Sequence, residues 1–377
     1  MRRRVGLLLG LCLGITLWSV GAAARSDQEL VYFGTQGTGG VQAAWLDQKS
    51  GELRGIGKVS DIPHPFWLTL HPKLPVLYAA GGTSNTADST IYSFKVDPKS
   101  GQLAELNHQD AGGHWTQHVI VDPSAHSLLE ANYNSSTVGV FALQADGSIG
   151  TLDQLQTQTG SGPYPRRQEH SQPHYIVFDP RDHFALISDL GADRIFVYRF
   201  DPSAHTLQPA SEVALPPGSG PRHTVLDARG KYFYVITELT ATVHVFSWDA
   251  KRAKLEALQS LSAYPDDYSG SVPKSGAEIR LSPNGRFVYV SLRGDQNSIV
   301  QFAVNSRDGT LAFVDRVPTG GERPMSFTID PTGRWMLVAN AQSDSVTVLK
   351  IDPSTGKLTA NGSLAVQRPV AVAFYTH

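Results

Sequence analysis

Hydrophobic residues recur along the chain in short runs, each of which ends at a turn. Successive turns are 51, 57, 48, 55 and 48 residues apart. The runs are "WLTLHP" (67–72), "HVIVDP" (118–123), "YIVFDP" (175–180), "HTVLDA" (223–228), "EIRLSP" (278–283) and "SFTIDP" (326–331). A period near 50 residues indicates an array of repeated structural units.

Each unit contains further strand-like segments. A second apolar run follows each turn, as in "YFYVITEL", and a third segment alternates apolar and polar residues, as in "ATVHVFSW". A period of two is typical of a half-buried strand. Another turn and a segment that begins with Leu or Ile come next, and the alternating segment and this turn each occur seven times. Four short strands in about 50 residues are the content of one propeller blade.

The first unit lacks its inner strand. Residues 30–53 supply only the later strands, and "RPVAVAFYTH" (368–377) has the pattern of the missing one. Joining both ends of the chain in one blade closes the ring and removes exposed strand edges. We therefore predict an all-β fold: a seven-bladed β-propeller with four antiparallel strands per blade, closed by the C-terminal strand. The alternative is an open solenoid or a pair of sandwiches, but no atypical capping repeats support it.

The N-terminal segment does not follow the repeat. Three arginines precede an apolar stretch (5–20) and three alanines (22–24). This order is that of a secretory signal peptide. We predict a signal peptide over 1–24, a single propeller domain over 25–377 and export to the periplasm or the medium. No membrane span is expected after cleavage, and a retained membrane anchor is the alternative.

Composition narrows the possible partners. Cys12 is the only cysteine and lies in the predicted signal peptide, so the mature protein has no thiol. Cleavage removes three arginines and moves the formal charge from −2 to about −5. With no basic tract left, a nucleic-acid partner has no electrostatic support. We expect a monomer.

Alignment of the blades on their turns shows where polar residues interrupt the apolar pattern. In blades two to seven, the inner strand begins with Phe66, Gln117, His174, Arg222, Ala277 and Met325. With one gap after Asp182, the second strand ends at Gly82, Tyr133, Asp189, Glu238, Arg293 and Ala341. Consecutive strands are antiparallel, so both positions lie at the same end of the sheet. The charged residues are therefore predicted to converge at one mouth of the central channel.

Two longer loops, 157–172 and 263–276, precede inner strands and should rise over the same mouth. Candidate substrate-binding residues are Arg167 and Gln168 in the first loop, together with Asp189 and His223. Arginines, carboxylates and a histidine in one cluster suit an anionic, hydrolysable ligand. The alternative is a set of ion pairs that only joins the blades. His170 and His174 are four residues apart, but they lie at a loop-to-strand join, so we expect no metal.

Four segments contain more specific motifs. They are "SQPHYIVFDP", "GSGPRHTVLDARGKYFYVITEL", "GAEIRLSPNGRFVYVSLRGD" and "RPMSFTIDPTGRW". In these segments the sequence resembles the seven-bladed propeller lactonases, a family that includes 6-phosphogluconolactonases and carboxy-muconate-cyclising enzymes. The resemblance implies that the family's catalytic His, Arg, Glu and Arg correspond to His174, Arg222, Glu238 and Arg293, and that its Arg-Gln pair corresponds to Arg167 and Gln168. Leu292 departs from the pattern, since Asn is frequent there in the family.

The resulting hypothesis is hydrolysis of a small anionic or sugar lactone without a cofactor. His174 or Glu238 would act as general base, with His174 favoured because two nearby arginines should lower the Glu238 pKa. Arg222 and Arg293 would bind the anionic group and the developing oxyanion. A signal peptide is unexpected for cytoplasmic sugar-phosphate metabolism, so a phosphorylated substrate stays open. The alternatives are a non-enzymatic exported propeller that binds protein or carbohydrate, and a redox propeller, for which no convincing ligand set is present.

Overall fold

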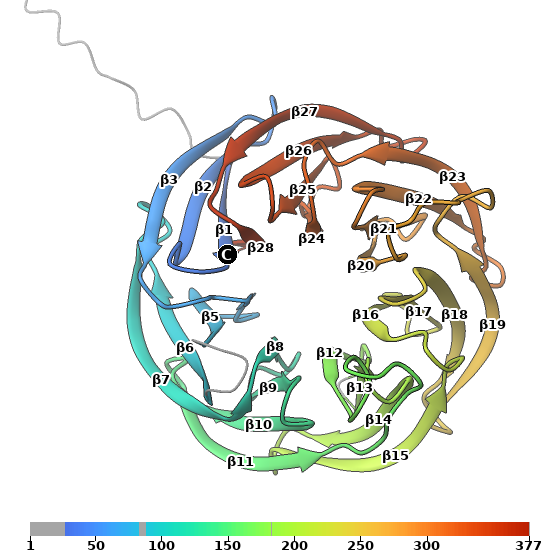
Figure 1. Ribbon diagram of the computed structural model, residues 1–377. Helices are drawn as coiled ribbons and strands as arrows, with labels where there is room; N and C mark the ends of the chain where they lie inside the picture. Colours follow the sequence, from blue (N-terminus) through green and yellow to red (C-terminus); the bar gives the residue numbers. More distant parts are fainter. Residues whose placement is uncertain (1–26, 83–87, 182, 377) are drawn as a thin grey trace, which may run out of the picture.

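The computed structural model describes residues 27–82, 88–181 and 183–376, which form a closed ring of seven four-stranded antiparallel blades (Figure 1). The prediction of a seven-bladed propeller is confirmed. Within these ranges no helix is long and apolar enough to cross a membrane. The predicted signal peptide, 1–24, lies outside the described residues.

Each blade begins with an inner strand at the channel and ends with an outer strand at the rim. Blade one contains, in this order, β28 (Pro369–Phe374), β1 (Gln28–Thr35), β2 (Val41–Asp47) and β3 (Leu53–Ser60). Blade two contains β4 (Trp67–Leu70), β5 (Val76–Gly81), β6 (Asp88–Val96) and β7 (Leu103–His114). Blade three contains β8 (Thr116–Val121), β9 (Ser127–Asn132), β10 (Thr137–Leu143) and β11 (Ile149–Thr157). Blade four contains β12 (Pro173–Phe178), β13 (Phe184–Asp189), β14 (Arg194–Asp201) and β15 (Thr206–Ala214).

The last three blades repeat this order. Blade five contains β16 (Pro221–Leu226), β17 (Tyr232–Thr237), β18 (Thr242–Asp249) and β19 (Lys254–Ser262). Blade six contains β20 (Gly276–Leu281), β21 (Phe287–Leu292), β22 (Ser298–Val304) and β23 (Leu311–Pro318). Blade seven contains β24 (Pro324–Ile329), β25 (Trp335–Asn340), β26 (Ser345–Ile351) and β27 (Leu358–Ala365).

The two ends of the described chain meet in blade one. Strand β28 pairs antiparallel with β1, from Val31 opposite Phe374 to Thr35 opposite Pro369. All six residues of β28 are buried. The C-terminal strand therefore closes the ring, as the sequence predicted.

Neighbouring blades are joined by apolar packing and by a repeated hydrogen bond. Apolar side chains of the inner and middle strands fill the space between adjacent blades, as where Tyr32 of blade one packs with Leu77 of blade two. Four buried tyrosines also donate a hydroxyl hydrogen bond to a glycine carbonyl in the next blade. These pairs are Tyr32 with Gly101 (3.1 Å), Tyr78 with Gly147 (2.7 Å), Tyr234 with Gly309 (3.0 Å) and Tyr289 with Gly356 (2.7 Å).

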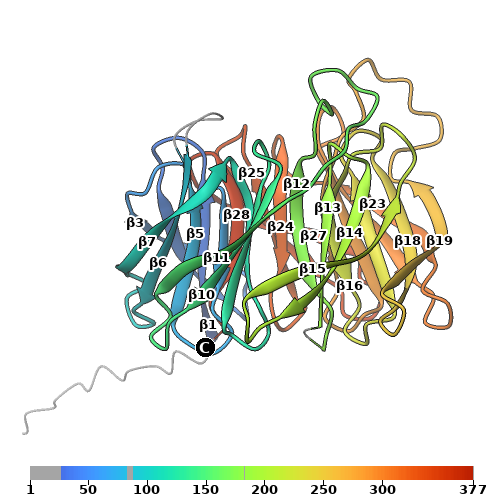
Figure 2. The same cartoon turned by 90° about the horizontal axis from the view of Figure 1, so that it is seen from below.

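One face of the ring carries the two longest inter-blade loops. The loop from β11 to β12 and the loop from β19 to β20 both rise from the same end of the propeller (Figure 2, green and gold). Tyr164 and Arg167 of the first loop line the same cavity as Val272 and Lys274 of the second. This face is the mouth at which the sequence placed its candidate residues.

Candidate active site

The four candidate catalytic residues come from equivalent places in three neighbouring blades. His174 and Arg222 are the second residues of the inner strands β12 and β16. Glu238 and Arg293 directly follow the second strands β17 and β21, and their backbone N–H groups donate to carbonyls just before the inner strand of their blade. Antiparallel pairing thus brings all four to one end of the channel. They line one cavity of about 240 Å³.

Glu238 is the centre of this cluster. Its carboxylate accepts hydrogen bonds from Arg222 Nε at 3.0 Å and from Arg167, and it forms an ion pair with Arg293 Nη2 at 2.8 Å. Only 12% of the Glu238 side chain is exposed. Burial alone would raise the Glu238 pKa, but the charges of Arg293, Arg222 and Arg167 outweigh it and hold this pKa well below its usual range. Glu238 is therefore ionised at neutral pH and holds three guanidinium groups around the cavity.

His174 faces the cavity next to this charged group. Its side chain packs edge-on against Tyr133 and against His223, with ring centroids 5.7 Å and 5.2 Å away. Burial and the nearby Arg222 charge lower the His174 pKa well below its ordinary value. Its Nδ1 is enclosed and has no hydrogen-bond partner in the described chain, which leaves Nε2 as the nitrogen available to the cavity. A neutral imidazole with a free nitrogen can accept a proton from water.

Behind Arg222, the His223 ring lies between the guanidinium group and a second carboxylate, Glu278. Arg222 Nη1 donates to His223 Nε2 at 3.0 Å, and His223 Nδ1 lies 3.0 Å from Glu278 Oε1. Because an arginine has no acceptor, His223 carries its proton on Nδ1, on the side of Glu278. Burial and the Arg222 charge lower the His223 pKa well below its ordinary value, so this ring is neutral. His223, predicted to bind substrate, is 2% exposed and lies where it orients Arg222.

Two further predicted substrate-binding residues lie away from the cavity. Gln168 is fully buried and donates to the Leu190 carbonyl and to Asp193 Oδ1, both at 2.8 Å. Asp189 is also fully buried, and it accepts from Ser171 and from backbone N–H groups at 172 and 192. Burial raises the Asp189 pKa to about 6. Both side chains fix the backbone of the loops beneath the mouth.

The placement of Asp189 corrects the sequence alignment. The Asp179 N–H bonds the Phe184 carbonyl, just as the Asp227 N–H bonds the Tyr232 carbonyl, so the two turns have equal length and the gap after Asp182 is wrong. Without the gap, Asp189 is equivalent to Thr237. Leu190 then corresponds to Glu238.

Sequence reasoning missed Arg323. It lies just before β24, has a positive φ of 55°, and lines the cavity next to Arg293. Its guanidinium makes no ion pair with a carboxylate in the described residues. Burial and the Arg293 charge lower the Arg323 pKa, the direction expected for a cation without a close counter-ion. The dipeptide Arg-Pro at 323–324, repeated at 368–369, was the available signal.

The cavity and its continuation under the long loops are strongly cationic. One carboxylate, Glu238, faces five basic side chains, which are Arg167, Arg222, Lys274, Arg293 and Arg323. Burial and the Arg293 charge lower the Arg222 pKa only to about 10, so this group stays protonated at neutral pH. Across the described ranges no three His, Cys, Asp or Glu side chains are grouped to hold a metal ion.

Comparison with known proteins identifies the family. The family described as "Lactonase, 7-bladed beta-propeller" matches residues 30–374. The chain belongs to this family. It is therefore a lactonase-family enzyme, as the resemblance implied.

Individual relatives match over nearly their full length. A 6-phosphogluconolactonase of Bacillus subtilis is 33% identical over 350 residues, 91% of this chain and 97% of the relative. One from Formosa agariphila is 33% identical over 342 residues, 87% of this chain and 95% of the relative. Among solved structures, a periplasmic gluconolactonase of Pseudomonas aeruginosa is 30% identical to this chain, with a TM-score of 0.86. The superposition covers 93% of this chain and 99% of the gluconolactonase chain.

Proposed function

We propose that this lactonase hydrolyses an anionic sugar lactone, with 6-phosphogluconolactone as the reference substrate, and that it does so outside the cytoplasm. The observation that carries the proposal is the charge of the cavity, where one carboxylate faces five basic side chains. Such an excess of fixed positive charge favours an anionic ligand over a neutral one. The names of the Bacillus and Formosa relatives support a phosphorylated sugar lactone.

The reaction needs a base and an oxyanion site, and the cavity offers both. His174 Nε2 takes a proton from water as the water oxygen attacks the lactone carbonyl carbon. Arg222 and Arg293 stabilise the negative oxygen of the tetrahedral intermediate. The ring C–O bond then breaks, and the leaving oxygen takes the proton from His174 to give the hydroxy acid. Glu238 keeps the guanidinium groups in place, and Arg323 binds the substrate's anionic group.

The test follows acid release from 6-phosphogluconolactone and from gluconolactone above the uncatalysed rate. His174→Gln and Glu238→Gln should each lower kcat/KM by about 10²-fold or more, the scale of acid–base and electrostatic residues. Arg323→Ala should raise KM for the phosphorylated lactone and leave its kcat nearly unchanged, because it removes ground-state binding.

The controls separate the parts of the proposal. Leu258→Ala, an exposed residue of the outer strand β19, should behave like wild type. Wild-type kcat/KM in both His174→Gln and Glu238→Gln would refute the assigned roles. No acceleration on either lactone by the wild-type protein would favour the non-enzymatic binding propeller.

The proposed location rests on the N-terminal pattern and on the periplasmic gluconolactonase to which the chain is similar. Cleavage of the signal peptide predicts a mature chain that begins at Arg25. Intact-mass measurement of the protein recovered from the periplasm or medium shows whether the mature chain begins at Arg25. A chain that retains residues 1–24, or remains in the cytoplasmic fraction, would contradict export.

A further inference from the structure

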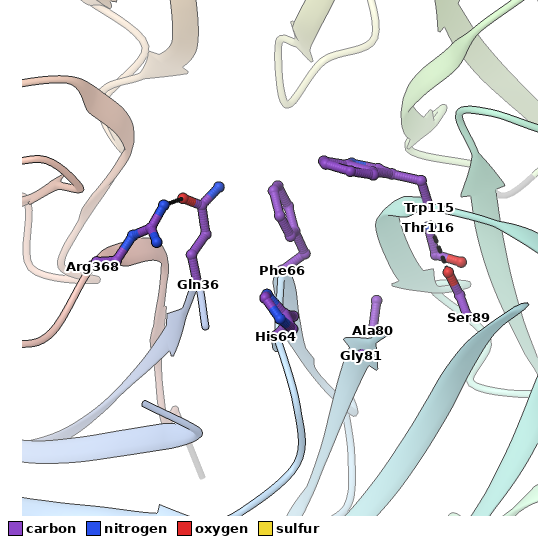
Figure 3. A pocket seen from close by; sticks show the side chains of 10 residues that line it. Gln36, His64, Phe66, Ala80, Gly81, Ser89, Trp115, Thr116 and Arg368 are labelled. Atoms are coloured by element: carbon purple, nitrogen blue, oxygen red, sulfur yellow. Dashed lines mark hydrogen bonds between the residues drawn. The ribbon is translucent and has the colours of Figure 1, made fainter. Parts of the chain in front are cut away.

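A second pocket adjoins the charged cavity on the side of blades one to three (Figure 3). It has a volume of about 200 Å³. Gln36, Phe66 and Trp115 line both this pocket and the charged cavity, so the two spaces meet at these side chains. A single ligand can therefore extend from one into the other.

The exposed wall of this second pocket is mostly apolar and includes two aromatic rings, with His64 and Arg368 among its polar members. Phe66 and Trp115 are half-buried and contact each other, with ring centroids 5.4 Å apart and planes tilted by 57°. Figure 3 shows Ala80 and Gly81 between Phe66 on one side and Thr116 on the other. Among the residues that the structure describes, no carboxylate lines the pocket. We call it the aromatic pocket.

A missing side chain creates this space. The backbone N–H of Gly82 donates to the Pro63 carbonyl in the segment that leads into β4, and the Glu238 N–H donates to the Gly220 carbonyl in the segment that leads into β16. Gly82 thus occupies in blade two the position that Tyr133 and Glu238 fill in blades three and five. Gly82 and Ser89 both line the aromatic pocket, and a Cβ atom at Gly82 would lie 3.3 Å from Ser89 Oγ, so a large side chain there would take up part of this space.

Several polar groups of the aromatic pocket are already engaged within the protein, among them His64 Nδ1, which accepts from the Gly37 N–H at 2.9 Å. Arg368 donates to Gln36 Oε1 at 3.0 Å, and Ser89 Oγ accepts from the Thr116 N–H at 3.0 Å. Sugar hydroxyl groups placed over Ala80 and Gly81 would lose water without gaining partners, which is costly. A planar apolar group has no hydrogen bonds to water to lose there, and it gains contact with two aromatic rings.

We propose that the aromatic pocket binds a planar apolar group of the substrate, so that the preferred substrate is an anionic lactone extended by such a group. The inference rests on the proposed function for the anionic end of the ligand. The charged cavity has about 240 Å³ for the lactone ring and its anion, and the aromatic pocket adds a comparable volume beside it. The ligand class is thus amphipathic, with the anion at Arg323 and the apolar ring against Phe66 and Trp115.

The experiment compares two phosphate monoesters of equal charge, ethyl phosphate and 2-phenylethyl phosphate. Their dissociation constants are measured by titration calorimetry on the full-length mature protein, and their inhibition constants on lactone hydrolysis. Wild type should bind 2-phenylethyl phosphate about tenfold more tightly, the scale of burying part of one aromatic side chain. Equal affinities would overturn the aromatic subsite.

Three variants test whether the phenyl ring of 2-phenylethyl phosphate binds in the aromatic pocket. Phe66→Ala and Trp115→Ala should each reduce the ratio of the two affinities toward one. Gly82→Leu should do the same by taking up space in the aromatic pocket while keeping both aromatic rings, and thermal unfolding of each variant checks that it is folded. Phe313→Ala is the matched control, because Phe313 is 58% exposed on the outer strand β23. A ratio that persists in all three variants would place the phenyl ring elsewhere and refute the inference.

The experimental results distinguish a failure of the proposed function from a failure of the aromatic subsite. If neither phosphate binds, the proposed anion site fails and the inference fails with it. If the ratio and its loss in the variants hold while neither lactone is hydrolysed, the aromatic subsite stands and the proposed reaction is wrong. If Arg323→Ala weakens both phosphates equally, their anions share the predicted site.

Discussion

At the scale of single residues, the mouth depends on the difference between two carboxylates. Glu238 is held ionised by three guanidinium groups, whereas Glu278 is fully buried behind His223 and burial raises its pKa against the charges of Arg280 and Arg222. The first carboxylate fixes the arginines that face the cavity. The second lies 3.0 Å from His223 Nδ1, on the side of the ring that faces away from Arg222.

The low pKa of His174 predicts the pH dependence of the reaction. A base acts in its unprotonated form, and a lowered pKa keeps that form populated to lower pH. The Glu238 pKa is also held low, so neither candidate base gains a proton near pH 6.5. We therefore expect kcat/KM to stay flat from pH 8 down through 6.5 and to fall only below that value.

Gluconolactone is the substrate for this measurement, because a phosphate ester has its own proton transition near pH 6. The uncatalysed rate is subtracted at each pH. An acid limb of kcat/KM with its midpoint at 6.5 or above would show a base of ordinary pKa, and would contradict the environment described for His174.

At the scale of elements, the turn between the third and fourth strands of each blade is the repeated point of contact with the previous blade. In blade seven, Gly356 has a φ of 69° and its carbonyl accepts from the Tyr289 hydroxyl. A Cβ atom there would lie 2.6 Å from the Phe287 ring. At this position of blade seven, only glycine avoids both the strain of positive φ and a clash with the neighbouring blade.

Gly356→Ala should therefore lower the free energy of unfolding by about 1–3 kcal/mol, through strain at positive φ and overpacking. Strand direction places this turn at the end of the blade opposite the mouth, so kcat should not change. Denaturant titration measures the loss. Gly362→Ala on β27 is the matched control, since its Cβ would meet no atom within 4 Å. Equal stability of the two variants would contradict the close contact at Gly356.

The strands were predictable because each blade repeats one pattern, and an error in one repeat is corrected by the others. The positions of His174, Arg222, Glu238 and Arg293 followed from strand direction alone. Arg323 did not, because it lies before its strand at a positive φ that periodicity does not reveal. The aromatic pocket could not be predicted from the sequence either, since it lies beside Gly82, a position without a side chain.

Asp189 shows a second limit of the sequence pattern. The pattern predicts that this acidic residue at the end of a strand faces the mouth, but the register differs by one position and the side chain is buried inside the protein. Successive residues of a strand point to opposite sides, so an alignment error of one residue reverses the predicted direction. Only the hydrogen bonds of the turn at Asp179 give the correct register.

At the scale of the whole molecule, charge is distributed unevenly. The full chain has a formal charge of −2, yet the mouth has five basic side chains against one carboxylate. A concave, partly desolvated site of one sign concentrates the field and attracts ligands of opposite charge from solution. The positive mouth on a chain of negative formal charge is therefore the region where we expect an anion to bind.

Ring closure has a consequence for the order of events during synthesis. Strand β1 is among the first structured segments to leave the ribosome, but its partner β28 is among the last. Repeats elsewhere in the chain can pair as they emerge, whereas blade one stays incomplete until translation ends. Under the proposed export with the N-terminus first, the ring of blades would stay open during translocation, and the six-residue strand β28 would close it on the far side of the membrane.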